Sequence, residues 1–140
     1  MRLNKKGVYG LIALVDIAKH ANLGAVKVVD VCERQKIPTA FLRKLFLDFK
    51  DKNIIKAQRG PGGGYVLAKE PENISVYEVL QVLGEEMSYE KAFKSDEKSE
   101  EFLKISSIFS DLSLNIERSL KALSLSDIIK LSIHDNNNEE

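Results

Sequence analysis

The sequence has very little cysteine and no long apolar run, and each absence excludes a class of protein. Its 140 residues include one cysteine, Cys32, so one chain cannot form an internal disulfide, a multi-cysteine zinc site or an all-cysteine iron–sulfur cluster. No apolar run approaches the roughly 18 to 20 residues of a membrane-spanning helix, and no secretory signal pattern opens the chain. We therefore expect a cytoplasmic protein without a membrane partner.

Groups that could carry catalysis are also scarce. His20 and His134 are far apart in the sequence, and neither is a plausible base for a Ser or Cys nucleophile. Residues 60–64, Gly-Pro-Gly-Gly-Gly, lack the Lys and following Ser or Thr of a phosphate-binding P-loop. We expect no enzyme, no metal, no cofactor and two surface histidines.

The net charge of zero conceals two halves of opposite sign. Residues 1–69 hold 14 Lys and Arg against 5 Asp and Glu, whereas residues 70–140 hold 7 against 16. The first half therefore carries +9 and the second −9. Either these charges merely solvate each half, or a basic anion-binding module is joined to a part that must not bind the same anion. Nucleic acid is the first candidate partner.

The apolar spacing of the basic half predicts three helices. The first spans residues 5–20 with Asn4 as its N-cap, and the second, shorter one buries Val28, Val31 and Cys32 while Asp30, Glu33 and Arg34 point outward. The third spans residues 39–52 after a turn at 36–38. Its buried stripe is Phe41, Leu42, Leu45, Phe46 and Phe49, and its opposite face is Thr39, Ala40, Arg43, Lys44 and Lys50. Asn53 suits the left-handed conformation that ends many helices.

After the third helix the helical spacing of apolar residues ends, and the sequence predicts a β-hairpin. Residues 54–58 and 65–67 are prone to form strands, and Arg59 with a glycine-rich tip lies between them. Three helices followed by a basic hairpin are the order of a winged helix-turn-helix, whose third helix enters the DNA major groove. The predicted fold is mostly α with a small β-hairpin wing.

The acidic half predicts three more helices and one loop. Ser75 and Glu78 match a capping box for a helix that ends at Gly84, and Ser124 with Asp127 can cap another that runs through Leu131. We interpret residues 85–101 as an acidic loop with at most a fragment of helix. Residues 134–140 form a polar tail, expected to fray. The predicted units are a winged domain (1–84), the loop (85–101), a dimerisation helix with a short C-terminal helix (99–133) and the tail.

A long helix over residues 99–123 exposes more apolar surface than a small winged domain can cover. The apolar residues of its main stripe are three or four positions apart, as in the contact between two helices that pack along each other. The stripe is Phe102, Ile105, Phe109, Leu112, Ile116, Leu120 and Leu123. A second copy would cover it in a homodimer that matches a palindromic operator in double-stranded DNA, whereas the alternative is a helix folded back on its own domain.

Short motifs through the first half resemble the Rrf-two family of bacterial winged-helix regulators. They are Met1-Arg2-Leu3, Lys6-Gly7 with Tyr9, Glu33-Arg34-Gln35 with Ile37, Leu45-Phe46, and above all Arg59-Gly60-Pro61-Gly62-Gly63-Gly64-Tyr65. The resemblance is ungapped from Met1 to about Leu83, and the long helix with residues 124–129 fits the family's dimerisation region.

The resemblance implies sequence-specific DNA binding, with the third helix in the major groove and Arg59 of the wing in the minor groove. Gly60 and Pro61 can present that arginine on a preset turn. Arg43 and Lys44 suit guanine edges, although they are alternatively a solvated helical face. IscR-like members often carry Glu and Gln there, so a different operator is expected. Four further lysines are interpreted as phosphate contacts or solubility charges: Lys5, Lys6, Lys50 and Lys56.

The chain departs from the family where many members hold an iron–sulfur cluster. Those members carry three cysteines in the loop before the long helix, whereas residues 85–101 here contain none. Val8 and Ile12 stand where some members draw an acidic or His ligand from the first helix. We expect no cluster, and a solvated acidic loop rather than a site for Mg²⁺ or Ca²⁺. Cys32 is interpreted as a core residue, with a thiol switch as the alternative.

The leading hypothesis is a homodimeric, cluster-free repressor that blocks a promoter by occupying it. One rival is a winged domain reused as a protein-interaction module. Another is a regulator controlled by a protein co-regulator, for example a metabolic enzyme, bound through the acidic half.

Overall fold

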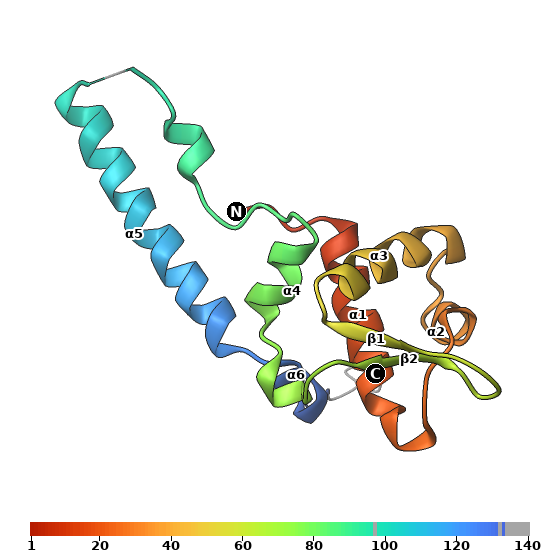
Figure 1. Cartoon of the computed structure of the whole chain (residues 1–140). Helices are drawn as coiled ribbons and strands as arrows, with labels where there is room; N and C mark the ends of the chain where they lie inside the picture. Colours follow the sequence, from red (N-terminus) through yellow and green to blue (C-terminus); the bar gives the residue numbers. More distant parts are fainter. Residues whose placement is uncertain (97, 132, 134–140) are drawn as a thin grey trace, which may run out of the picture.

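Six α-helices and one hairpin make up the part of the chain that this computed structural model describes, residues 1–96, 98–131 and 133 (Figure 1). The helices are α1 (Lys5–Lys19), α2 (Val28–Gln35), α3 (Thr39–Asp51), α4 (Val76–Val82), α5 (Glu100–Ala122) and α6 (Leu125–Lys130). The strands are β1 (Ile55–Gln58) and β2 (Gly64–Leu67). Three short 3-10 turns join them: η1 (Ala21–Leu23), η2 (Pro71–Asn73) and η3 (Glu90–Phe93). The predicted fold class is confirmed.

Helix α1 is the centre of the winged domain, where it contacts α2, α3, α4, α6 and β2. Its Ala13, Leu14 and Ile17 are fully buried, together with Leu42 and Phe49 of α3. Because these residues recur at helical spacing, one face of each helix enters a shared core. Each of the three helices predicted for the basic half is present, and α1 and α3 each end one residue earlier than predicted.

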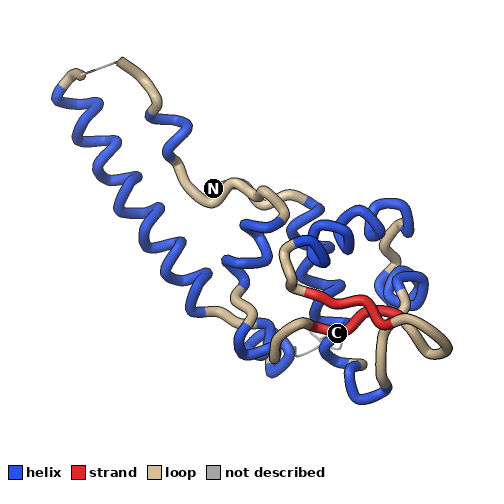
Figure 2. The backbone as a smooth tube through the Cα atoms, viewed as in Figure 1, coloured by secondary structure: helices blue, strands red, loops and turns tan. Residues whose placement is uncertain are grey.

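The two strands form one hairpin (Figure 2). It is antiparallel, and its register pairs Ile55 with Leu67 and Gln58 with Gly64. A third segment joins it, because Val26 and Tyr65 exchange backbone hydrogen bonds of 2.9 and 2.7 Å. This bridge ties the wing to the residues just before α2. Asn53 has the left-handed backbone predicted for it, with φ of 58°.

Helices α4 and α6 begin side by side. The Val76 N–H donates to the Leu123 carbonyl (2.8 Å), and the Leu125 N–H donates to the Ile74 carbonyl (3.0 Å). Ser124 and Asp127 form the capping box that the sequence predicts, and Leu125 is fully buried in the core of the winged domain. The predicted units therefore need one revision: α6 packs with the winged domain rather than with α5.

Helix α5 extends away from the winged domain (Figure 1), and none of its residues is buried. The segment before α5 turns back along it, so that η3 packs on the helix. The Phe93 ring lies 6.0 Å from the Phe102 ring and 5.4 Å from the Phe109 ring. The segment before α5 thus covers part of the predicted dimerisation stripe.

The side chain expected to cap α1 does not do so. Asn4 occupies the N-cap position, but its side chain makes no capping hydrogen bond. Glu85 takes that role instead, because its carboxylate accepts from the Gly7 N–H (2.9 Å) and from the Asn4 N–H (3.1 Å). The interpretation of residues 85–101 as a solvated loop is therefore wrong for Glu85, which is buried.

No helix in the described ranges is both long and apolar enough to cross a membrane. The predicted polar tail, residues 134–140, lies outside the described residues, as does His134.

Candidate nucleic-acid interface

Helix α3 presents a basic face because its opposite face is anchored in the core. Leu42, Leu45, Phe46 and Phe49 are buried, which fixes the rotation of the helix about its axis. The residues left on the outer face are Thr39, which is half-buried, and Ala40, Arg43, Lys44 and Lys50, which are exposed. The sequence predicts this division, except that Phe41 of the predicted buried stripe is only half-buried and packs against the edge of the core.

The start of α1 lies beside the start of α3. Lys5, Tyr9, Ala40 and Lys44 line one shallow cleft of about 510 Å³. Beneath it the Tyr9 and Phe41 rings meet edge to face, with centres 5.6 Å apart. Lys5 and Lys44 therefore lie at the same cleft, and together they make this edge positively charged.

Not every lysine singled out in the sequence joins this surface. Lys6 is half-buried, and its ammonium lies towards Gly84 at the end of α4. Lys50 on α3 and Lys56 on β1 are exposed. Lys5 is the one of these lysines from outside α3 that the structure brings next to the outer face of that helix.

The wing tip is a narrow glycine turn that exposes Arg59. The Gly63 N–H donates to the Gly60 carbonyl (2.9 Å), and Gly60 has φ of 96°, a conformation that favours glycine. At Gly64 a Cβ would lie 2.5 Å from the Val26 carbonyl oxygen, so only glycine allows this close approach. The turn leaves the Arg59 guanidinium outside the hairpin.

An aromatic contact fixes the wing relative to α3. The Tyr65 ring of β2 meets the Phe46 ring of α3 edge to face, with centres 5.1 Å apart. Since Tyr65 also pairs with Val26, one residue joins the wing, the strand-like segment before α2 and the third helix. The basic wing and the basic helix are thereby held in one arrangement.

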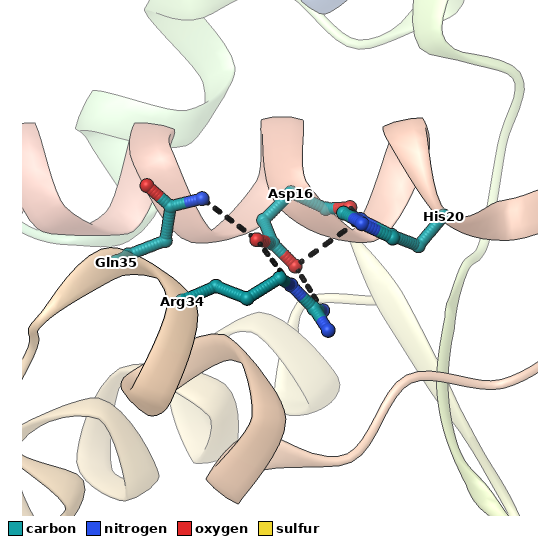
Figure 3. A network of polar contacts seen from close by, with 4 residues as sticks. All are labelled: Asp16, His20, Arg34 and Gln35. Atoms are coloured by element: carbon teal, nitrogen blue, oxygen red, sulfur yellow. Dashed lines mark hydrogen bonds and ion pairs between the residues drawn. The ribbon is translucent and has the colours of Figure 1, made fainter.

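A buried carboxylate locks α2 against α1 (Figure 3). Asp16 is 1% exposed, and its two oxygens accept from Arg34 Nε (3.0 Å) and Nη2 (2.6 Å). Gln35 Nε2 donates a further bond of 2.7 Å. Arg34 is exposed, as its place on the outer face of α2 predicts, and its guanidinium also reaches Asp16 on α1, because a buried carboxylate requires partners.

His20 belongs to the same network. Its Nδ1 lies 2.8 Å from the Asp16 carbonyl oxygen and 3.6 Å from the carboxylate. The expectation of a plain surface histidine is therefore wrong for His20, which is half-buried against α1.

The Asp16 carboxyl stays ionised despite its burial. Desolvation by burial is the largest single influence and would raise its pKa. The hydrogen bonds from Arg34 and Gln35, together with the charge of Arg34, outweigh it and lower the pKa below its ordinary value. The carboxyl is therefore ionised at neutral pH.

Sequence reasoning missed the functions of Asp16 and Glu85. Asp16 interrupts the apolar face of α1, between Val15 and Ile17, and a lone acid in such a place is a signal for a buried partner. Glu85 gives no such signal, because it follows Gly84 at the start of an acidic stretch. Its contact with Gly7 spans 78 residues, which only the tertiary fold creates.

The described residues offer little for iron to bind. Among them, no three His, Cys, Asp or Glu side chains are grouped so that they could hold a metal ion. Cys32 is 8% exposed and belongs to the core of the winged domain. This burial favours its interpretation as a packing residue over a thiol switch.

Comparison with known proteins identifies the family. Residues 3–131 match the model of the Rrf2 (Rrf-two) family, described as iron-dependent transcriptional regulators. The chain belongs to the Rrf2 family. It is 32% identical over 131 residues to the transcriptional regulator IscR of Xenorhabdus nematophila, across 93% of this chain and 80% of that one.

Solved structures of Rrf2-type regulators have the same fold. IscR of T. potens superposes with a TM-score of 0.76 at 27% identity, over 96% of this chain and 94% of that one. CymR of B. subtilis, the global cysteine regulator, superposes with a TM-score of 0.81 at 21% identity. The match covers 95% of this chain and 99% of that one. The second likeness shows the fold alone.

Membership of the Rrf2 family makes this chain a DNA-binding transcriptional regulator of the helix-turn-helix type and not an enzyme. The iron in the family's description does not fit the described residues of this chain, given its single buried cysteine and the lack of a grouped donor set.

Proposed function

We propose that this Rrf2 protein is a homodimeric repressor that works without an iron–sulfur cluster and recognises a palindromic operator. The observation that carries the proposal is α5, a helix of 23 residues in which no residue is buried. At 1.5 Å per residue it is about 35 Å long. A free helix with so much apolar surface is unfavourable in water, so a partner surface must cover it.

The apolar side chains of α5 support a second copy as that partner. Ile105, Ile108 and Leu112 are each 43–59% exposed, and they lie on one side of the helix at spacings of three and four. Leu103 and Leu114 on another side of the helix, and Leu123 at its C-cap position, are also exposed. Phe102 and Phe109 pack on η3 of their own chain, so they contribute to the interface at its edge.

In the proposed complex the outer face of α3 enters the major groove. Arg43 and Lys44 contact base edges, where guanine offers two acceptors to such side chains. Thr39 and Ala40 lie at the first turn of α3, the part of a recognition helix that approaches the bases. Lys5, Lys50 and Lys56 contribute phosphate contacts, and the partly buried Lys6 contributes less.

The wing supplies the second contact. Arg59 lies at the exposed tip, between β1 and the turn formed by Gly60 and Pro61. We propose that it enters a narrow minor groove, where the negative potential is concentrated. Occupancy of promoter DNA by the dimer is then sufficient to repress transcription.

The test is selection of the purified protein against random duplex DNA, followed by titration of the winning sequence across a salt series. We expect a palindromic winner, two chains per duplex and a steep loss of affinity with salt. Enrichment of a single half-site with one chain bound would contradict the dimer. Recovery of no sequence would instead favour the interaction module or control by a protein co-regulator.

A further inference from the structure

A second cleft lies between α4, residues 87–93 and α5. Its volume is about 620 Å³, within the range of roughly 300–1,000 Å³ typical of sites for small molecules. The cleft is open to solvent and shares no residue with the candidate nucleic-acid interface.

Aromatic rings gather around this cleft. The whole chain has ten aromatic residues, six Phe and four Tyr, and four of them line it: Tyr77, Tyr89, Phe93 and Phe109. The Tyr89 and Phe109 rings meet edge to face, with centres 5.1 Å apart. All four are half-buried and lie outside the core of the winged domain, so parts of their rings remain open to the cleft.

The charge of the lining is negative. It includes Glu90 and Glu117 and, among the described residues, no Lys, Arg or His. Glu90 is exposed and forms no ion pair with any described residue. The lining therefore disfavours an anion and leaves one carboxylate uncompensated.

At the edge of the cleft, the ammonium group of Lys121 already contacts a carboxylate and an aromatic ring of the lining. Lys121 Nζ lies 3.1 Å from the Glu117 carboxylate and 4.8 Å from the centre of the Tyr77 ring. A cation that is held by both a carboxylate and an aromatic face is the arrangement by which proteins bind organic cations. Lys121 already satisfies Glu117, so Glu90 is the carboxylate left for a ligand.

Hydroxyl groups complete the lining. Ser106, Ser110 and Ser113 follow one another at helical spacing on the face of α5 towards the cleft. The Ser113 hydroxyl accepts from the Tyr89 N–H (3.0 Å) and holds the segment 87–93 in place. The Ser110 hydroxyl is exposed beside the rings, where it can bond a polar group of a ligand.

We propose that this cleft binds a small aromatic amine in its protonated form. The rings of the cleft contact the aromatic body, Glu90 attracts the ammonium group, and Ser110 bonds a polar substituent. This combination of aromatic walls, one free carboxylate and hydroxyl groups selects against a carboxylate-bearing ligand of the same size.

The cleft is connected to the DNA-binding side through a short stretch of backbone. Met87 of the lining follows Glu85 by two residues, and Glu85 holds the first turn of α1 at Gly7. Lys5 in that turn lies beside Lys44 of α3. A ligand that moves residues 87–90 thereby changes operator affinity. This effect on DNA rests on the proposed function, whereas the binding of the ligand to the cleft does not.

The experiment compares two probes that differ in charge, tyramine and 3-(4-hydroxyphenyl)propionate. Calorimetry and amide chemical-shift mapping on the full chain are expected to show tyramine binding with a dissociation constant below about 1 mM. The propionate, with the same ring and hydroxyl group, is expected to bind at least about tenfold more weakly. Shifts are expected at residues 87–93 and 106–117.

Two matched leucine substitutions on α5 locate the site. Ser110→Leu fills the cleft and is expected to abolish tyramine binding, whereas Ser107→Leu lies outside the lining and is expected to leave it unchanged. Glu90→Gln is expected to weaken tyramine without affecting the fold. Equal binding of both probes, no binding of either, or full binding by Ser110→Leu would overturn the proposal.

An operator titration then separates the two proposals. If tyramine binds and changes operator affinity in the wild type but not in Ser110→Leu, the site is an effector site. If the protein selects no operator at all, the proposed function fails. Calorimetry still shows in that case whether the cleft binds tyramine. If tyramine binds without any effect on DNA, the connection through Glu85 is wrong and the site remains.

Discussion

Arg59 is one exposed side chain on a glycine turn, and its effect on DNA can be isolated from the fold. Arg59→Ala is expected to weaken binding to the selected operator by about 1–3 kcal/mol, because it removes the guanidinium from the minor groove. The dimer is expected to stay intact, since Arg59 is exposed and far from α5 along the chain. Fluorescence anisotropy with the operator and with a scrambled duplex measures the loss.

Lys56→Ala is the matched control for Arg59, because it removes one positive charge from the same hairpin. We expect a smaller loss of affinity that is equal for the two duplexes, as for a phosphate contact. If Arg59→Ala bound the operator as tightly as the parent protein, the role of the wing would have to be abandoned.

Asp16 is a residue whose charge supports the fold rather than the DNA contact. Its pKa is lowered in the folded state, so the unfolded chain takes up the proton more readily. The resulting stabilisation is fully present above the unfolded pKa of about 3.9 and is lost as pH falls through the lower folded value.

Asp16→Asn is expected to lower the free energy of unfolding at neutral pH by about 1–3 kcal/mol, because Arg34 and Gln35 lose their acceptor. Urea unfolding at several pH values measures this difference, which is expected to shrink below about pH 4. Asp111→Asn, on the exposed surface of α5, is the control. A difference that did not depend on pH would show that packing, rather than charge, explains the loss.

At the scale of single elements, the start of α1 depends on a side chain from another part of the chain. The N-terminal N–H groups of a helix need acceptors, and the Glu85 carboxylate supplies two bonds to the Asn4 and Gly7 N–H groups. Glu85→Ala is expected to cost about 1–2 kcal/mol of stability, as for the loss of an N-cap. Hydrogen exchange of Gly7 measures the fraying directly.

Glu86→Ala is the control for this substitution, because it removes a neighbouring carboxylate that makes only a long ion pair of 3.8 Å with Lys91. We expect it to change stability by less than about 0.5 kcal/mol. Equal protection of Gly7 in the two variants would mean that Glu85 does not hold the helix in solution.

At the scale of the whole molecule, the open question is what covers α5. Ile105→Asp combined with Leu112→Asp places two charges on the apolar side of α5 that its own chain leaves exposed. We expect the mass measured by light scattering to fall from that of two chains to that of one, because a charge within an apolar interface is strongly unfavourable. Circular dichroism checks that the winged domain remains folded.

Ser107→Asp, which adds one charge on another side of α5, is expected to keep the mass of two chains. If the double variant kept the same mass as well, α5 would have to be removed from the proposed interface. A double variant that unfolds would be replaced by Ile105→Ser with Leu112→Ser, which removes apolar surface without adding charge.

The sequence by itself determined the elements and their faces. Apolar spacing located α1, α2, α3 and α5, and the serines before α4 and α6 marked where those two helices begin. These features are local, because a helix buries residues at intervals of three and four and its first turn needs a nearby acceptor. The outer face of α3 and the exposed Arg59 follow from the same local rules, so the basic surface was predictable from the sequence.

Only the tertiary structure decided which distant groups meet. The exposed Arg34 of α2 donates to the buried Asp16 carboxylate of α1, and Glu85 accepts from the Gly7 N–H 78 residues away. The cleft between α4, residues 87–93 and α5 likewise exists because three separate segments fold together. Local spacing cannot specify such pairs, since a buried charge or an open helix end takes whichever complementary group the packing of the whole chain brings within reach.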